Sequence, residues 1–369
     1  MNYLKLIKKF YIVITFLLIL NSVYSQSRIN NKLTDFGILN YPDRKYKGGP
    51  PPEPKKERMD GQKLGKIFSS FSIQKTTQQI ELGKRNIIIG SRGTRLTIPA
   101  GTFQYSDYLT AKGSATLHLY EVIDEFDYMI AGVYHIYNDL NKVNHHLQLG
   151  GMIKFEIYQG TVRLRMSGEY PILVDFPLFN PEKKFNLYYI NLDGVWIKKV
   201  DYGLYDIFPS LVQEADGKKQ TGVRQFKMNA QGWWGFGLPI KNMAVIKSKI
   251  ISENPGTNDN FHIVSSGEGY KSYIGKWTKG LDFTIPVFPK VKSRIIVSDN
   301  QGNIGISDFH EAPPYIAFDT EQESSENVFL EIPPIYLKLV PQEYYGNEDR
   351  FREFLNLKRE EVQVNYPTR

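Results

Sequence analysis

The residues best suited to hold a cation are three acids close together in the chain, Asp124, Glu125 and Asp127. Ca²⁺ takes about six to eight oxygen ligands, and several of them commonly come from one loop. The spacing of these acids lacks the alternating ligands and the central glycine of a dedicated calcium loop. We therefore expect a solvated loop after a strand that ends at Val122, with a calcium site as the alternative.

Histidines form the second candidate set, because neutral imidazole is a common metal ligand. His145 and His146 are adjacent. Neighbours on a strand point to opposite faces, so both reach one ion only if the backbone bends. We expect a polar loop before Leu147 instead. His118 lies between two leucines, which predicts a place on the exposed face of a strand rather than a role as a base.

The sequence contains no set of residues that would carry catalysis. There is no nucleophile elbow and no His-Glu-x-x-His pair, and Gly235-Phe-Gly237 lacks the following helix and lysine of a phosphate-binding loop. The count of Cys 0 excludes thiolate nucleophiles, thiolate metal sites and disulfides. The sequence leaves open a catalytic pair of acids from distant strands, but it does not indicate which two acids would form it. We expect a protein that is not an enzyme and needs no cofactor or metal.

Aromatic residues are the positive feature of the composition, at 14% of the chain. Trp233 and Trp234 are adjacent, so on a strand one ring is expected inside and the other exposed or covered by a neighbouring domain. We favour a structural role in which Trp233, Trp234 and Phe236 seal an interface between two domains, because tryptophan is a common interface anchor. The alternative is stacking on a sugar face. The candidate partner or glycan contacts are Trp233, Trp234, Tyr270, Tyr273 and Trp277.

Residues 1–25 predict export. Lys5, Lys8 and Lys9 precede an apolar run at residues 10–20, and a polar stretch then leads to Gln26, which is the order of regions in a secretory signal peptide. The run is shorter than the roughly 20 apolar residues of a membrane-spanning helix, and no later segment approaches its apolar length. We expect cleavage near Ser25 and no transmembrane segment in the mature chain. The loss of three lysines would lower the formal charge from +7 to +4.

Residues 26–60 are expected to form an extended, disordered, basic arm. Pro50, Pro51, Pro52 and Pro54 lie between lysines, and such a composition buries too little apolar area to fold alone. The functional alternative is a strap that lies on the surface of a partner. Elsewhere Lys and Arg are scattered among Asp and Glu, so no basic patch indicates a nucleic-acid partner.

The rest of the chain alternates apolar and polar residues in short runs broken by Gly, Asn and Asp, which predicts an all-β fold. Leu96 and Ile98 face one way on a strand, and Pro99 and Gly101 turn the chain at the rim of the sheet. By length we expect two tandem β-sandwiches, at residues 61–240 and 241–340. Residues 341–369 are predicted to form a short helix, capped by Asn347, and a tail.

Two segments carry a resemblance to a known family. Residues 93–103, Gly-Thr-Arg-Leu-Thr-Ile-Pro-Ala-Gly-Thr-Phe, and residues 113–122, Gly-Ser-Ala-Thr-Leu-His-Leu-Tyr-Glu-Val, resemble the core of the ZU-five domain of zonula occludens proteins, ankyrins and UNC-type netrin receptors. The chain is more closely similar to secreted proteins of the Bacteroidetes in which a second sandwich follows, Ig-like or like the regulatory domain of carboxypeptidases. The resemblance covers most of residues 85–300 and implies the fold and an envelope setting, but no activity.

Together these expectations describe an exported, non-enzymatic structural or adaptor subunit of an outer-membrane assembly in a bacterial cell envelope. Its partners would be envelope or outer-membrane proteins that bind β-sandwich surfaces and open sheet edges, in the periplasm or at the cell surface. The alternative is a glycan-binding module that uses exposed Trp and Tyr rings.

Overall fold

The structure is a computed structural model that describes residues 64–139, 143–178, 185–190, 195–199, 205–207, 222–240, 243–252, 260–312 and 329–360. The predicted signal peptide, the arm with Pro50, Pro51, Pro52 and Pro54, and the expected domain boundary at residue 241 lie outside the described residues. Within these ranges the fold is all-β, with two short α-helices. Neither helix is both long enough and apolar enough to cross a membrane.

The first sandwich, built from β1 to β15, contains a large sheet. Over the described residues its eight strands follow the order β1-β5-β7-β15-β11-β12-β6, with β8 paired to β7. β6 also pairs with β7, so part of this sheet closes on itself. The strands are β1 (Lys75–Glu81), β5 (Ser114–Val122), β6 (Ile136–Asn138), β7 (Asn144–Gln159), β8 (Val162–Arg163), β11 (Asn186–Ile190), β12 (Trp196–Lys199) and β15 (Gly232–Ile240).

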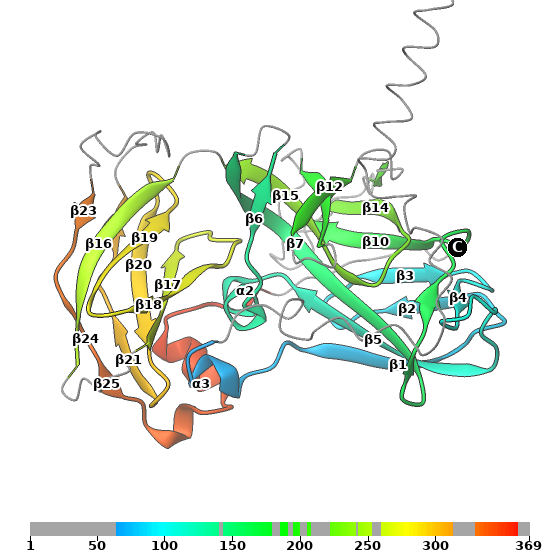
Figure 1. Ribbon diagram of the computed structural model, residues 1–369, viewed down its shortest axis with the longest axis horizontal. Helices are drawn as coiled ribbons and strands as arrows, with labels where there is room; N and C mark the ends of the chain where they lie inside the picture. The colour runs from blue at the N-terminus through cyan, green and yellow to red at the C-terminus, as the bar shows by residue number, and fades with distance from the viewer. Residues whose placement is uncertain are drawn as a thin grey trace, which may run out of the picture. The chain divides into compact units, whose positions relative to one another are not determined.

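A smaller sheet packs against one face of the large one. Its order is β13-β14-β10-β3-β2, and the last four of these strands can be followed in Figure 1. The predicted alternation explains the packing, because Leu96 and Ile98 point into a core shared with Phe155 and Trp234 of the large sheet. The strands are β2 (Asn86–Ile89), β3 (Arg95–Ile98), β10 (Ile172–Leu178), β13 (Tyr205–Ile207) and β14 (Gly222–Met228), and β4 (Phe103–Gln104) pairs separately with β9 (Arg165–Met166).

The second sandwich, built from β16 to β25, also has two sheets. One has the order β19-β16-β23 with β24 paired to β16, and the other has the order β18-β17-β20-β21-β25 with β22 paired to β20. No pairing in the described ranges joins β15 or an earlier strand to β16 or a later one. The strands are β16 (Ala244–Ile251), β17 (Asn260–Gly267), β18 (Ile274–Lys279), β19 (Asp282–Val287), β20 (Lys292–Ser298), β21 (Asn303–Ile306), β22 (His310–Glu311), β23 (Leu330–Glu331), β24 (Ile335–Tyr336) and β25 (Lys338–Leu339).

A third hydrophobic core, the junction core, combines residues of both sandwiches with the helices. It includes Phe126 of α2 (Glu125–Ala131), Phe351 of α3 (Glu348–Phe354) and Phe68 of the 3-10 helix η2 (Phe68–Ser70). Val264 and Ile296 join it from β17 and β20. A second 3-10 helix, η3 (Gln342–Tyr344), precedes α3.

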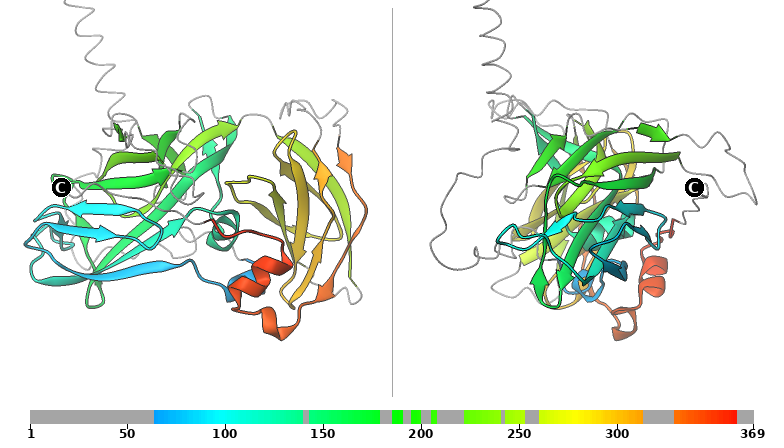
Figure 2. Two further views of the ribbon diagram at one scale, coloured as in Figure 1. Left: turned by 180° about the vertical axis from the view of Figure 1, so that it is seen from behind. Right: turned by 90° about the vertical axis from the view of Figure 1, so that its right-hand side faces the viewer.

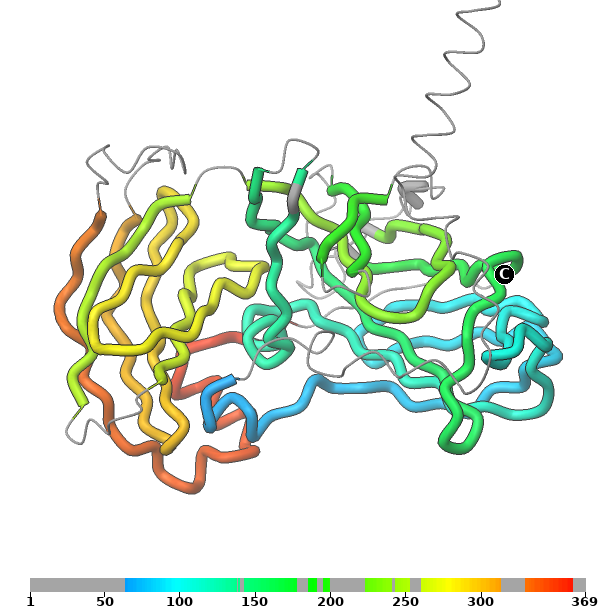
Figure 3. The backbone as a smooth tube through the Cα atoms, in the orientation of Figure 1, coloured from blue at the N-terminus to red at the C-terminus, as the bar shows by residue number. Residues whose placement is uncertain are grey.

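The strand β17 illustrates how alternation serves two cores. Phe261 and Ile263 point into the core of the second sandwich, whereas Val264 belongs to the junction core. Near the other side of the junction core, the segment that begins at residue 64 (blue) runs beside α3 (red) in Figures 2 and 3, and Gly346 N donates to Ser70 Oγ at 3.2 Å. The predicted C-terminal helix is confirmed, and its N-cap is Asn347, whose side chain accepts from Arg350 N.

Candidate functional site

The acidic segment that begins at Asp124 is a buried helix start. The prediction of a solvated loop was wrong: Asp124 caps α2, and its side chain accepts from Asp127 N at 3.0 Å. The Asp127 carboxylate in turn accepts from Asp124 N, which completes a capping box. Asp124 and Asp127 are 1% and 3% exposed. Each of the two carboxylates therefore accepts a hydrogen bond from a backbone N–H at the start of α2. Because a buried charge is costly unless it is paired, both also need positive charges from other parts of the chain.

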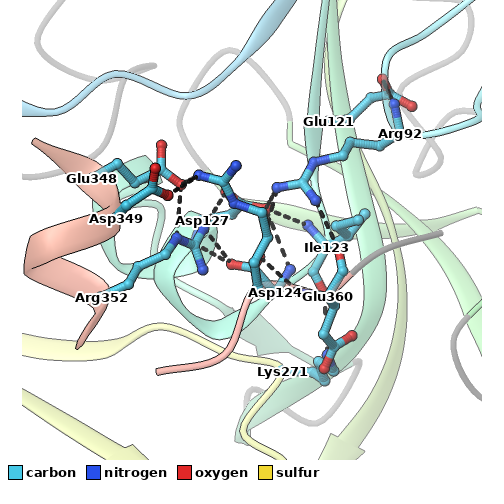
Figure 4. Close-up of polar contacts among 11 residues, drawn as sticks. Arg92, Glu121, Ile123, Asp124, Asp127, Lys271, Glu348, Asp349, Arg352 and Glu360 are labelled. Atoms are coloured by element: carbon cyan, nitrogen blue, oxygen red, sulfur yellow. Dashed lines mark hydrogen bonds and ion pairs between the residues drawn. The ribbon is translucent and has the colours of Figure 1, made fainter. Parts of the chain in front are cut away.

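Two arginines from distant parts of the chain supply that charge (Figure 4). Arg352 of α3 donates to Asp124 Oδ1 at 3.1 Å and lies 3.5 Å from Asp127 Oδ1. Arg92, in the loop between β2 and β3, lies 3.6 Å from both carboxylates. We call these four residues the ion-pair cluster. It links the first sandwich to the C-terminal helix.

Burial has the largest effect on the pKa of Asp127 in the cluster. It raises the pKa of Asp127 to about 6, and the charge of Asp124 adds to the rise, while Arg92 and Arg352 oppose it. Arg352 also contacts Phe126, with its guanidinium 4.5 Å from the ring centroid, and bonds Glu348 at 2.7 Å. The arginine is therefore held from several sides, as a positioned structural cation would be.

Glu125 connects α2 to the second sandwich. Its Oε1 accepts from Gly267 N, at the end of β17, at 3.0 Å. Burial raises the pKa of this carboxyl to about 7, although hydrogen bonds from Ser266 and Gly267 and the charges of Arg294 and Lys271 oppose the rise. One acidic segment thus contacts the C-terminal helix through its two aspartates and the second sandwich through its glutamate.

The chain after α3 is fixed to both sandwiches. Arg294 of β20 donates to Leu355 O, and Lys271 of the second sandwich pairs with the Glu360 carboxylate. Arg92 of the first sandwich donates to Glu360 O at 2.7 Å. Phe351 adds an apolar contact, because its ring stacks on Phe71 with centroids 5.0 Å apart. Residues 348–360 therefore contact both sandwiches and hold them together.

The cluster is arranged for ion pairing rather than for a cation. The oxygens of Asp124 already accept from Arg352 and Asp127 N and face Arg92 and Glu360 N, so a calcium ion would have to displace two guanidinium groups. Within the described residues, no three or more His, Cys, Asp and Glu side chains come together as metal ligands. The cluster therefore holds α2 and α3 together through charge-assisted hydrogen bonds.

The five predicted aromatic contact residues are mostly interior. Trp233, Trp234, Tyr270 and Tyr273 are 4%, 1%, 1% and 1% exposed, and Trp277 is half-buried against His262. Trp233 and Trp234 do point to opposite faces of β15, as alternation requires, but neither ring is at the surface. Trp233 and Tyr273 lie in the junction core, Trp234 in the core of the first sandwich and Tyr270 in that of the second. The expectation that Trp234 and Phe236 seal the interface was therefore wrong, because both fill the first sandwich.

The predicted polar loop at His145 and His146 is part of β7, because β6 provides a pairing partner, Ile136 opposite His146. His145 bonds Asp139 at 2.9 Å, whereas burial lowers the pKa of His146 to about 4. The two rings do not share a ligand position. His118 sits on β5, where it bonds Thr77 Oγ1 at 3.0 Å.

Sequence reasoning missed the basic half of the site. Arg92 lies within the turn from Gly90 to Gly93 that precedes β3. Arg352 stands four residues after Glu348, a spacing typical of a helical ion pair. That spacing indicates the local pair with Glu348 but gives no sign of Asp124. The pairing of α3 with α2 is a tertiary contact, so only the folded chain reveals it.

Fold and site together define an all-β protein of two sandwiches that are joined by a buried, ion-paired junction. The sequence matches no protein-family model, and no curated protein matches it.

Proposed function

We propose that this chain is an exported, non-enzymatic structural or adaptor subunit of a protein assembly in a bacterial cell envelope, and that it binds its partners through the surfaces of its two β-sandwiches. The junction carries this proposal: α2 bonds the C-terminal helix through Asp124 and the second sandwich through Glu125. Tandem domains move relative to each other unless their interface is large and apolar. A junction core closed by ion pairs favours one arrangement, which a subunit with several contact surfaces would use.

The buried ionisable groups support a structural role for the site. Strongly shifted pKa values often mark catalytic residues, but structural ion-pair networks shift them too. Here the shifted carboxyls, Asp127 and Glu125, are bonded to helix-start amides, to Gly267 N and to arginines. Their bonding partners are parts of the fold, which favours a role in assembly of the two sandwiches.

The envelope setting is inferred from the sequence. The signal-peptide pattern at residues 1–25 supports export. The sequence contains no cysteine to carry a thiol-linked lipid. The proline-rich segment at residues 26–60 is the proposed strap on a partner. The glycan alternative loses support, because four of its five rings are buried.

Co-purification from native membranes tests the proposal. The mature chain, beginning at Gln26, should retain an outer-membrane protein at a fixed stoichiometry, and deletion of residues 26–60 should weaken retention. A matched control replaces residues 26–60 by a glycine and serine segment of equal length, which keeps the length of the arm and removes its proline-rich sequence. A freely monomeric protein with no co-purifying component would contradict the proposal.

A further inference from the structure

The strand β2 ends the smaller sheet of the first sandwich. In the described part of the chain, β3 is its one paired neighbour. Ile88 is 1% exposed and packs in the core, whereas Ile87 and Ile89 are 54% and 57% exposed. The open edge therefore carries two large apolar side chains on its outer face.

The backbone of β2 also faces outward at these two positions. Gly90 N donates to Thr94 O at 2.7 Å. This bond shows which residues of β2 direct their backbone groups toward β3. Because backbone groups of an antiparallel strand alternate in direction, Ile88 bonds toward β3, and the N–H and C=O of Ile87 and Ile89 point to the open edge. In the described residues, neither Ile87 nor Ile89 pairs with another strand on this side. The N–H of Ser91, which points the same way, already donates to Thr76 Oγ1 of β1 at 2.9 Å, so an added strand would pair with residues 87–89 alone.

Two other edge strands, β1 and β19, carry residues that oppose pairing. β1, at the edge of the large sheet, has the sequence Lys-Thr-Thr-Gln-Gln-Ile-Glu, and β19, at the edge of a sheet in the second sandwich, contains Pro286. Charged residues and proline discourage edge pairing. The sequence of β2, Asn-Ile-Ile-Ile, contains neither.

Charge indicates the chemistry of the occupant. Lys84 and Arg85 are exposed and directly precede β2, and neither side chain has an ion-pair partner in the described structure. Glu81, the acid nearest in sequence, accepts a hydrogen bond from Ser114 Oγ at 2.8 Å and offsets one of these two charges, so the local excess is one positive charge. An antiparallel strand on this edge would bring its C-terminal end to these two cations.

We propose that β2 is the docking site for an extended segment of a partner protein, which adds as an antiparallel strand and ends in acidic residues. Its alternate apolar side chains lie beside Ile87 and Ile89, and its acids lie near Lys84 and Arg85. The inference deepens the proposed function and rests on it for the origin of the partner.

The test uses the mature chain and the peptide acetyl-Thr-Val-Thr-Val-Thr-Val-Asp-Glu, labelled for fluorescence anisotropy. Ile89→Pro removes an N–H of the open edge and leaves the ladder with β3 intact, so we expect about a tenfold loss of affinity. The double variant Ile87→Lys with Ile89→Lys should lose binding without any backbone change. Lys84→Glu with Arg85→Glu should weaken binding about threefold to tenfold at low salt. The control is Leu339→Lys, which alters another exposed apolar residue and should bind normally.

Each contrary result has a defined meaning. Equal peptide binding by the wild type and the β2 variants, with unchanged melting temperatures, would overturn the inference. Self-association that Ile89→Pro abolishes would show that a second copy of the chain binds this edge. Tighter peptide binding by a chain shortened after Glu360 would show that the chain's own last residues bind it. Either result would overturn the proposal that a partner protein supplies the added strand. If Ile89→Pro still retains the envelope partner, the inference fails and the adaptor function stands. If the peptide binds as expected and no envelope partner is found, the adaptor function fails and the edge site stands.

Discussion

Arg352 donates to Asp124 across 228 positions of sequence, at 3.1 Å, with both residues almost fully buried. The contact joins the last helix of the described chain to the cap of α2 in the first sandwich. A buried pair contributes little when compared with apolar residues of similar volume, but the loss of one partner leaves an uncompensated charge. The stability of the junction should therefore depend strongly on either member.

Replacing Arg352 by methionine should lower the free energy of unfolding by about 3 kcal/mol, because among the described residues Asp124 and Asp127 would keep Arg92 alone as a counter-charge. Urea denaturation measures the change. The matched control is Arg350→Met on the same helix, whose pair with Glu343 is largely exposed, so the expected loss is below about 1 kcal/mol. Similar losses for both variants would show that the buried cluster does not hold the junction.

The sequence predicts the sheets well where one residue type decides the local geometry. β3 ends at Ile98, directly before the predicted turn, because Leu96 and Ile98 alternate and Pro99 cannot continue the ladder. Gly101 adopts the left-handed φ of 78° that the turn after β3 requires.

The site could be predicted only in part. The sequence shows Asp124 and Asp127 as an acidic cluster, but their arginines lie far away in the chain. An acidic run without a nearby counter-charge is ordinarily solvated. α2 has only seven residues, too few to be helical by propensity alone, so its helix depends on its caps and on burial of Phe126. Tertiary contacts of this kind leave no periodic signal.

Gly151 lies where the register between β7 and β15 shifts, and it is a sensitive position. Gly151 has φ 143°, and an added Cβ would lie 2.4 Å from Phe176 Cζ in the core of the first sandwich. Gly151→Ala should therefore destabilise the protein by about 3 kcal/mol through strain and overpacking. Thermal and urea denaturation both report it. Gly83→Ala is the control, because an added Cβ there meets nothing within 4 Å, and it should be neutral or stabilising by about 0.5 kcal/mol.

Trp233 should act through stability rather than through sugar binding. The ring is 4% exposed in the junction core, so Trp233→Ala should cost about 4 kcal/mol of unfolding free energy. Because Trp277 is half-buried, Trp277→Ala should lower the free energy of unfolding by about half as much. Urea denaturation is paired with a screen of soluble polysaccharides. A Trp233→Ala protein of normal stability that has lost binding to a polysaccharide would restore the glycan-binding alternative.

Glu125 should make the stability of the junction depend on pH near neutrality. Burial raises its folded pKa from 4.5 to about 7, so the carboxyl favours folding while it is protonated. That contribution is complete below pH 4.5 and is lost as the pH rises through 7, because folding then requires a buried charge; the full shift corresponds to about 3 kcal/mol. Glu125→Gln keeps an acceptor for Gly267 N and cannot ionise. Its stability relative to the wild type should therefore increase from pH 5 to pH 8, as measured by urea denaturation at each pH, whereas Glu343→Gln, at an exposed site, should follow the wild-type profile. Parallel profiles for Glu125→Gln and the wild type would mean that this carboxyl is ionised throughout, and that the contact between α2 and the second sandwich is a charged hydrogen bond.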